Sequence, residues 1–250
     1  MRFKICDLVK GSLDDYKAHG PINIALIGDS VTHGCLNAAE GNHYDTVYHN
    51  RLKMMINTVY PDIPVNIINS AVAGECAGYA VHNFDRDVKR YMPDLVIICY
   101  GLNDVNFELE DFKNNLREFF KRTNELGIDC IFMKPNMMCT EVDDSLVIPE
   151  ERGYAEIVTV FQNEGRFDMF MEEADKVAAE FGITVCDCYS EWKKMAESGI
   201  NINKLLANGI NHPTREMHKL FAEKLYETIF SEKFDEKSYS SAIGGGLWRG

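Results

Sequence analysis

Residues 23–34 read NIALIGDSVTHG, in which a short apolar run leads directly into Gly28, Asp29 and Ser30. The run is rich in isoleucine and leucine and is too short for a typical helix, so it predicts a buried β-strand. A serine just after such a strand stands at the end of the sheet where parallel α/β proteins bind their ligands. This stretch therefore predicts both a type of fold and the first candidate residue of a site.

Four similar apolar runs follow along the chain and alternate with segments of helical period. They predict further strands at residues 65–69, 95–100, 130–134 and 183–186. Apolar residues at helical spacing predict helices over residues 111–126, 167–181 and 213–230, the last with Pro213 at its first helical position. The alternation predicts an α/β fold: a doubly wound parallel sheet of about five strands with helices on both faces.

Length and charge limit the class of protein. A chain of 250 residues can bury one sizeable core, and we expect a single domain over residues 1–237 with a flexible tail over residues 238–250. The formal net charge of −13 disfavours binding to nucleic acid or anionic lipid. No apolar stretch approaches the roughly 18 residues that a membrane span needs, and the N-terminus lacks the apolar segment of a signal peptide. We therefore expect a cytoplasmic protein.

The cysteines and histidines give no sign of a cofactor. The eight cysteines are scattered, several of them within apolar runs, which indicates buried free thiols. They lack the paired spacing of zinc sites, and His33, His43 and His49 match no ligand motif. No glycine-rich phosphate-binding loop follows the first strand. We expect neither a metal nor an organic cofactor.

The ends of the predicted elements supply groups that complement Ser30. Gly74, shortly after the second strand, lets the backbone approach a substrate closely. Asn103, after the third, offers a neutral amide donor suited to an oxyanion. His212 lies just before Pro213, and histidine can take a serine proton near neutral pH. Each residue alone is also typical of an ordinary turn, helix cap or surface loop, but together they indicate a nucleophile, a base and oxyanion donors.

In order and approximate spacing these segments resemble the SGNH (GDSL-like) hydrolase family, and the resemblance spans residues 23–230. The family's nucleophile motif is similar to GDSVTHG at residues 28–34, and its Gly-x-Asn-Asp block is similar to Gly101, Asn103 and Asp104. The resemblance implies a three-layer α/β/α sandwich of flavodoxin-like type without a cofactor.

The same resemblance implies how the site would work. Ser30 would form an acyl-enzyme during ester hydrolysis, with His212 as the general base. The oxyanion hole would consist of the backbone N–H groups of Ser30 and Gly74 and the side chain of Asn103.

Two positions depart from the family pattern. Ala71 replaces a glycine of the second block. The family also places an aspartate three residues before the histidine, where this chain has Gly209. Asn208 or a backbone carbonyl is left to accept the Nδ1 hydrogen of His212, and a carboxylate from the polar insertion at residues 139–153 is an alternative. We take the serine and the histidine as a dyad, with Asn208 as the candidate orienting residue.

Three further residues are candidates for the substrate pocket, because they lie within or beside the motifs: Asp29, His33 and Asp104. Asp29 is also expected to be a structural hydrogen-bond acceptor next to the nucleophile. Among the other charges, Asp143, Asp144, Glu150 and Glu151 are interpreted as solvated loop residues.

The substrate is predicted less directly than the site. No long apolar groove or lid is evident, so we expect a short acyl group, and family-level analogy favours an acetyl ester of a carbohydrate or another small molecule. A lysophospholipase or acyl-thioesterase on the same fold is the enzymatic alternative. Because the triad acid is missing, a flavodoxin-like binding domain without catalysis is the alternative from another class.

Overall fold

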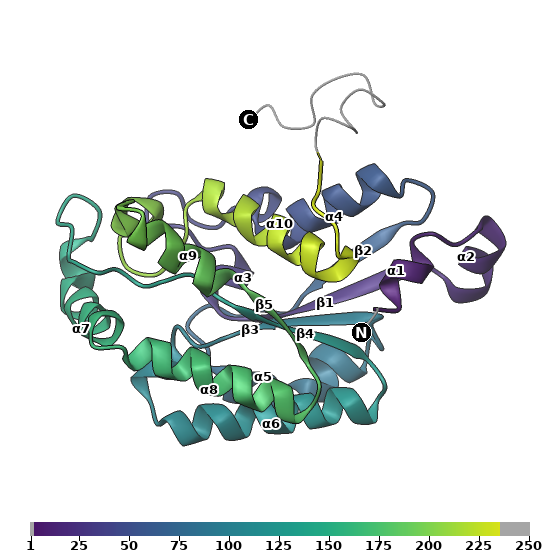
Figure 1. Ribbon diagram of the computed structural model, residues 1–250, viewed down its shortest axis with the longest axis horizontal. Helices are drawn as coiled ribbons and strands as arrows, with labels where there is room; N and C mark the ends of the chain where they lie inside the picture. The colour runs from purple at the N-terminus through teal and green to yellow at the C-terminus, as the bar shows by residue number, and fades with distance from the viewer. Residues whose placement is uncertain (1–2, 236–250) are drawn as a thin grey trace.

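The five predicted strands form one parallel sheet (Figure 1). The computed structural model describes residues 3–235, so the predicted tail at residues 238–250 lies outside the described residues. The strands are β1 (Ile22–Gly28), β2 (Val65–Asn69), β3 (Leu95–Cys99), β4 (Asp129–Lys134) and β5 (Thr184–Asp187). Their order is β2-β1-β3-β4-β5, which is the flavodoxin-like order of a doubly wound sheet. The predicted sheet is confirmed.

Burial explains why such short apolar runs form strands. Every residue of β3 is buried, and so is every residue of β1 except the half-buried Asn23. Central strands of a parallel sheet are covered on both faces, so their sequences are apolar throughout rather than alternating. β1 and β3 pair up to Gly28 opposite Cys99, and the winding direction of the chain changes between them. The crevice expected at such a switch point lies just beyond Gly28.

Helices cover both faces of the sheet, which confirms the three-layer α/β/α arrangement (Figure 1). One layer contains α4 (Tyr48–Val59), α9 (Cys188–Glu197) and α10 (Arg215–Phe230). The other contains α5 (Ala77–His82), α6 (Leu109–Glu125) and α8 (Arg166–Glu180). Within the layers, α10 packs on α4 and α6 packs on α8. The remaining helices are α1 (Ile5–Leu8), α2 (Leu13–His19), α3 (Ser30–His33) and α7 (Arg152–Asn163).

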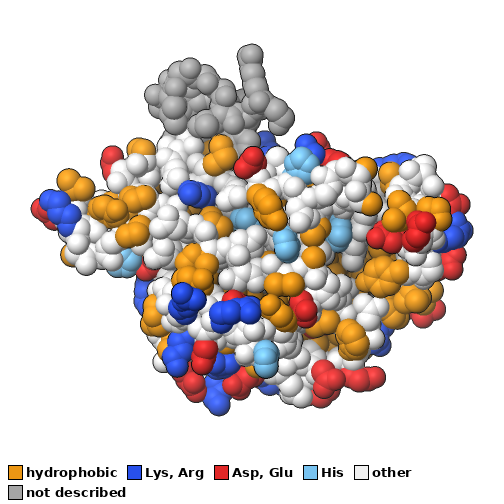
Figure 2. Space-filling view, turned by 180° about the vertical axis from the view of Figure 1, so that it is seen from behind, with side chains coloured by type: hydrophobic (Ala, Val, Ile, Leu, Met, Phe, Trp, Pro, Cys, Tyr) orange, Lys and Arg blue, Asp and Glu red, His pale blue; other side chains and the backbone are white. Residues whose placement is uncertain are grey.

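Helix α7 was not predicted, and the residue types within it explain why. Ala155 and Val158 are buried, whereas Ile157 and Val160 are about half exposed on the opposite side. Residues 157–160 are Ile, Val, Thr and Val, a run of β-branched side chains that locally favours a strand over a helix. Figure 2 shows hydrophobic side chains gathered at the end of the molecule that α7 occupies.

The start of the last helix differs from the prediction. Thr214 is its N-cap and Arg215 its first residue, so Pro213 lies outside the helix. Pro213 instead pairs with Leu206 in an isolated bridge, and the N–H of Ala207 donates to the carbonyl of His212 at 2.7 Å. Proline is compatible with either position because its fixed φ suits extended backbone too. The prediction was wrong because these contacts close residues 206–213 into a tight loop before the helix begins.

All eight cysteines lie within residues 3–235, where they are free thiols. Six are buried, and Cys35 and Cys76 are half-buried. Over the same residues, the structure contains no helix whose length and apolar content would let it cross a bilayer.

Candidate active site

Ser30 stands at the junction of β1 and α3, and its neighbours leave little freedom in that junction. A Cβ on Gly28 would lie 2.7 Å from the Cβ of Thr32 and 2.8 Å from the carbonyl oxygen of Cys99. Asp29 is the N-cap of α3, and its Oδ1 accepts from the N–H of Val31 at 3.0 Å. As the first residue of the helix, Ser30 has an N–H without an intrahelical acceptor. Its hydroxyl and N–H therefore both stand at the carboxyl edge of the sheet.

His212 reaches Ser30 from the loop closed by Leu206 and Pro213. Its Nε2 lies 2.9 Å from the Oγ of Ser30, and its Nδ1 lies 2.7 Å from the carbonyl oxygen of Leu36. A carbonyl oxygen can only accept, so Nδ1 carries the hydrogen of the neutral ring. The lone pair of Nε2 is then directed at the serine hydroxyl, which is the tautomer that a general base requires.

The carbonyl of Leu36 is fixed by the loop that follows α3. The N–H of Leu36 donates to the carbonyl of Gly41 at 3.1 Å, and Cys35 pairs with Asn42 in an antiparallel bridge. The acceptor for the imidazole thus belongs to a closed turn of backbone.

Asn208 does not take the role expected of it. Its Oδ1 accepts from the N–H groups of three residues that follow it, Ile210, Asn211 and His212, at 2.9–3.0 Å. A short Asn side chain tends to bond the backbone just after it. Asn208 therefore shapes the loop that carries the histidine, and the imidazole is held by Leu36 instead.

The position of the family's missing aspartate is closed to any side chain. Gly209 has a φ of +67°, and a Cβ built there would lie 2.6 Å from the Cβ of Leu146. Residues with a Cβ are strained at this φ, and Leu146 would have to move as well. The neighbouring Val147 is also buried, so this part of the polar insertion is packed against the histidine loop.

The predicted oxyanion donors line the same cavity as the nucleophile and the base. This cavity has a volume of about 270 Å³ and contains Ser30, Gly74, Asn103 and His212 in its wall. Gly74 has a φ of +82°, a conformation for which glycine is favoured. One N–H of the Asn103 amide donates to the carbonyl of Glu75 at 3.0 Å, and the amide carries a second one. The structure thus brings together the four residues that the sequence singled out.

Residues 26–220 match the GDSL-like lipase/acylhydrolase family. The chain belongs to this family. The match confirms the predicted family, which is one of carboxylic ester hydrolases, and it extends from β1 into α10.

Individual relatives of the family are distant. An acetylxylan esterase of Geobacillus stearothermophilus is 26% identical over 129 residues, which cover 45% of this chain and 58% of that protein. A solved acetylxylan esterase from the same organism has 20% identity and a TM-score of 0.64, covering 86% of this chain and 97% of that one. LAE5, an α/β hydrolase from the metagenome of Lake Arreo in Spain, has 17% identity and a TM-score of 0.64, covering 84% and 97%.

Solved catalytic mutants of that acetylxylan esterase change a serine, an aspartate or a histidine, and the aspartate precedes the histidine by three positions. In this chain Gly209 stands three positions before His212.

The three residues expected in the substrate pocket do not line the cavity around Ser30. Asp29 is fully buried beneath the nucleophile, as its N-cap role requires. Asp104 is also buried, and it accepts from the N–H groups of Ala77 and Gly101 at 2.9 and 3.0 Å. The ring of His33 stacks on Tyr44, and its Nδ1 accepts from the N–H of Ala73 at 3.3 Å. The pocket prediction was wrong because all three side chains are used to hold backbone turns.

Several residues that line the cavity were not predicted, and two of them, Glu151 and Tyr154, come from a part of the chain without any predicted site residue. Glu151 ends a short 3-10 turn (Pro149–Glu151), and Tyr154 lies in the first turn of α7. Glu151 lies near the end of the insertion, where its charge was interpreted as solvated, and Tyr154 directly follows the insertion. Contacts with the histidine loop bring this segment over the site: Leu146 packs on Gly209, and the N–H of Cys139 donates to the carbonyl of Ile210 at 2.8 Å. No sequence pattern signals them.

Burial shifts the pKa values of His212, Asp29 and Asp104. It lowers the pKa of His212, and the hydrogen bond to the Leu36 carbonyl offsets part of this effect. Burial raises the pKa of Asp29 to about 7 and that of Asp104 to about 6, in both cases against the opposing effect of backbone hydrogen bonds. The histidine is thus neutral over a wider range of acidic pH than a free imidazole.

We expect the acid limb of kcat/KM to lie below the ordinary imidazole pKa of about 6.5. Only neutral His212 can accept the serine proton, and a lowered pKa keeps the ring neutral as the pH falls. The measurement is kcat/KM for p-nitrophenyl acetate from about pH 4 to 9. Asp29→Asn, which keeps the N-cap acceptor, is the control and should leave this limb in place. A limb at or above 6.5, or one that disappears in Asp29→Asn, would contradict the assignment to His212.

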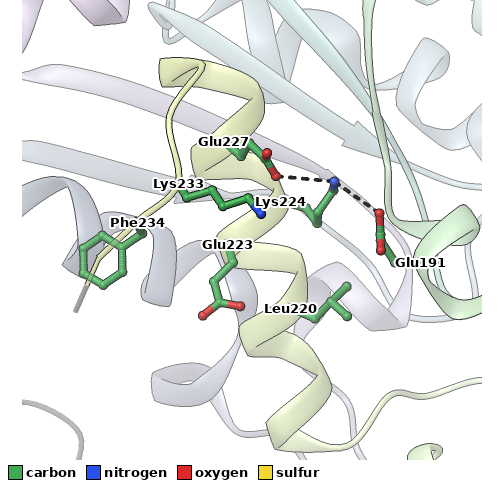
Figure 3. A pocket seen from close by; sticks show the side chains of 7 residues that line it. All are labelled: Glu191, Leu220, Glu223, Lys224, Glu227, Lys233 and Phe234. Carbon is green, nitrogen blue, oxygen red and sulfur yellow. Dashed lines mark hydrogen bonds and ion pairs between the residues drawn. The ribbon is translucent and has the colours of Figure 1, made fainter. Parts of the chain in front are cut away.

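A second cavity, of about 430 Å³, lies between α9 and α10, away from the site (Figure 3). Lys224 crosses it and pairs with Glu191 at 3.3 Å and with Glu227 at 3.4 Å. These charged side chains pair with one another, and neither Ser30 nor His212 lines this cavity. Its size therefore does not make it the better candidate for catalysis.

Proposed function

We propose that this protein is a serine esterase that removes a short acyl group, acetyl, from a hydroxyl group of a carbohydrate. The observation that carries the proposal is the hydrogen-bonded series from Ser30 Oγ to His212 Nε2 at 2.9 Å and from His212 Nδ1 to the Leu36 carbonyl at 2.7 Å. A serine and an imidazole within hydrogen-bond reach, with the imidazole held by a third group, are the arrangement of an activated nucleophile.

In the first half of the reaction, His212 Nε2 takes the proton of Ser30 as Oγ attacks the ester carbonyl carbon. The oxyanion that forms faces the N–H groups of Ser30 and Gly74 and the free amide hydrogen of Asn103. The ester C–O bond then breaks, and the imidazolium gives its proton to the leaving alcohol oxygen. In the second half, His212 activates a water that attacks the acyl-enzyme, and the carboxylic acid and free Ser30 result.

The absence of a triad carboxylate should lower the catalytic rate less in this site than the loss of a triad member usually does. A triad acid fixes the tautomer of the imidazole and stabilises the imidazolium. The Leu36 carbonyl performs the first task completely, and as a neutral dipole it performs the second in part. We infer a slower esterase than one with a full triad, with the same mechanism.

The preference for a short acyl group rests on the wall of the cavity. The cavity has a volume of about 270 Å³, and besides the four proposed catalytic residues it is lined by Cys35, Ala73, Glu151, Tyr154, Asn208, Ile210 and Asn211. The mixture of small apolar and polar groups suits acetyl better than an alkyl chain. The similarity to an acetylxylan esterase supports a carbohydrate as the alcohol part.

The test is the hydrolysis of p-nitrophenyl acetate, butyrate and octanoate at neutral pH. We expect kcat/KM to fall by at least about tenfold from acetate to octanoate, because the longer chain has no apolar groove to occupy. The release of acetate from acetylated xylooligosaccharides then tests the carbohydrate part. A kcat/KM that rises with chain length would favour a lysophospholipase or acyl-thioesterase. No turnover of any ester would contradict the proposal and favour a binding domain.

A further inference from the structure

A smaller cavity of about 140 Å³ adjoins the one that contains Ser30. The two cavities share four residues: Cys35, Glu151, Asn208 and His212. Gly74 and Asn103, the proposed oxyanion donors, line only the first cavity. The base thus lies at the junction of two spaces, and only one of them has the donors for a carbonyl oxygen.

Because the oxyanion donors line only one cavity, the acyl and alcohol parts of an ester can each be assigned to a cavity. The carbonyl and its acyl group must lie on the side of the oxyanion donors, because the oxyanion forms there. The leaving oxygen must face His212, which returns the proton to it. We propose that the adjoining cavity is the subsite for the alcohol part of the substrate and that the carboxylate of Glu151 makes it select against anionic alcohols. This inference rests on the proposed esterase function.

Glu151 carries an uncompensated charge at the junction. Its side chain is exposed and makes no capping hydrogen bond to α7. Within residues 3–235 the structure gives it no ion pair, and the adjacent Arg152 is paired with Asp144 and Glu156. A carboxylate in this state repels an anionic alcohol, accepts hydrogen bonds from a hydroxyl and attracts a cation.

The rest of the subsite includes amide side chains and adjoins a further cavity. In the described part of the chain the side-chain amide of Asn42 has no hydrogen-bond partner, so it can bind a hydroxyl group. Asn37, by contrast, donates to Glu40 and to the carbonyl of Ala207, and so serves the loop. A third cavity of about 450 Å³ shares Leu36 and Asn37 with the subsite, which leaves room for an alcohol of more than one sugar ring.

The test varies the charge of the alcohol while the acyl group stays acetyl. The probes are 4-acetoxybenzoate, 4-acetoxybenzamide and 4-acetoxyphenyltrimethylammonium, which are anionic, neutral and cationic. The ratio of kcat/KM for the cationic to the anionic probe is measured in the wild type, in Glu151→Gln and in Glu150→Gln. Comparing this ratio between enzymes cancels the different chemical reactivities of the probes. Glu150 is the matched control, because it is an exposed neighbour that lines neither cavity.

We expect Glu151→Gln to lower the ratio about five- to tenfold, the size expected for one partly solvated charge near another. The change should shrink as the salt concentration approaches about 1 M. Glu150→Gln should leave the ratio within about twofold of the wild type, since its side chain is exposed to solvent and lines neither cavity. An unchanged ratio in Glu151→Gln, or an equal change in Glu150→Gln, would overturn the proposal.

Two further measurements separate this inference from the function on which it rests. Asn42→Ala should raise KM several-fold for acetylated sugars and leave the acetate-to-butyrate preference unchanged. If Asn42→Ala changes acyl preference instead, the assignment of the two cavities is wrong. If the wild type hydrolyses none of the probes, the proposed function itself fails; an active wild type with no response at Glu151 refutes the subsite alone.

Discussion

Ester hydrolysis by Ser30→Ala is expected to fall by about a thousandfold or more relative to the wild type. The variant keeps the oxyanion donors and the base but lacks the atom that forms the acyl-enzyme. Because Ser30 is buried and the substitution only removes its Oγ, we expect the fold to be retained. The measurement is kcat for p-nitrophenyl acetate together with a thermal unfolding curve.

Two controls make this result specific. Ser70→Ala removes a hydroxyl just beyond β2 that does not line the cavity, and it should leave kcat within about twofold. The double variant Ser30→Ala/His212→Ala should be no slower than Ser30→Ala, because a nucleophile and its base act as one unit. Two results would show that another group performs the reaction. One is a rate in Ser30→Ala above a tenth of the wild-type rate, and the other is a loss in the double variant equal to the product of the losses in the two single variants.

Restoring the family's aspartate by Gly209→Asp is expected to lower the free energy of unfolding by about 2–5 kcal/mol and to reduce activity. The φ of +67° strains any residue with a Cβ, and the new Cβ would lie 2.6 Å from that of Leu146. The histidine loop would have to move, and with it the imidazole. Chemical denaturation measures the loss of stability, and kcat for p-nitrophenyl acetate measures the loss of activity.

Gly209→Ala separates packing from charge, because it adds the Cβ without a carboxylate. We expect it to be destabilised about as much as Gly209→Asp. Adding Leu146→Gly removes the opposing Cβ and should recover part of the stability, whereas Leu146→Ala keeps that atom and should not. A stable Gly209→Asp with higher kcat would contradict the structural reason given for the missing acid.

The fold could be predicted because its strands are covered on both faces. Complete burial gives β1 and β3 continuous apolar sequences, which a short window detects without knowledge of their partners. Helix boundaries depend on local caps and on more distant contacts. Pro213 was assigned to a helix on a local rule, but its pairing with Leu206 holds it in the preceding loop. Helix α7 was not predicted because the β-branched run at residues 157–160 locally favours a strand.

The candidate site also contains residues that could be predicted from the sequence and residues that could not. Ser30, Gly74, Asn103 and His212 follow from motifs, because each acts through a group that only a few residue types supply. Leu36 was not predicted, since it acts through its carbonyl, which every residue has. The two aspartates beside the motifs were assigned to the pocket, but sequence alone does not show which way a carboxylate points. Asp29 and Asp104 both turn inward to bond backbone N–H groups.

The carbonyl that holds His212 also affects how the site tolerates mutation. A triad acid can be lost by a single base change in its codon, whereas any amino acid placed at position 36 brings a carbonyl with it. The carbonyl of Leu36 would move away from His212 only if the path of the backbone changed. That path is fixed by the turn that Gly41 and the pairing of Cys35 with Asn42 keep closed. The activation of the nucleophile therefore depends on two side chains, those of Ser30 and His212, instead of the three of a full triad.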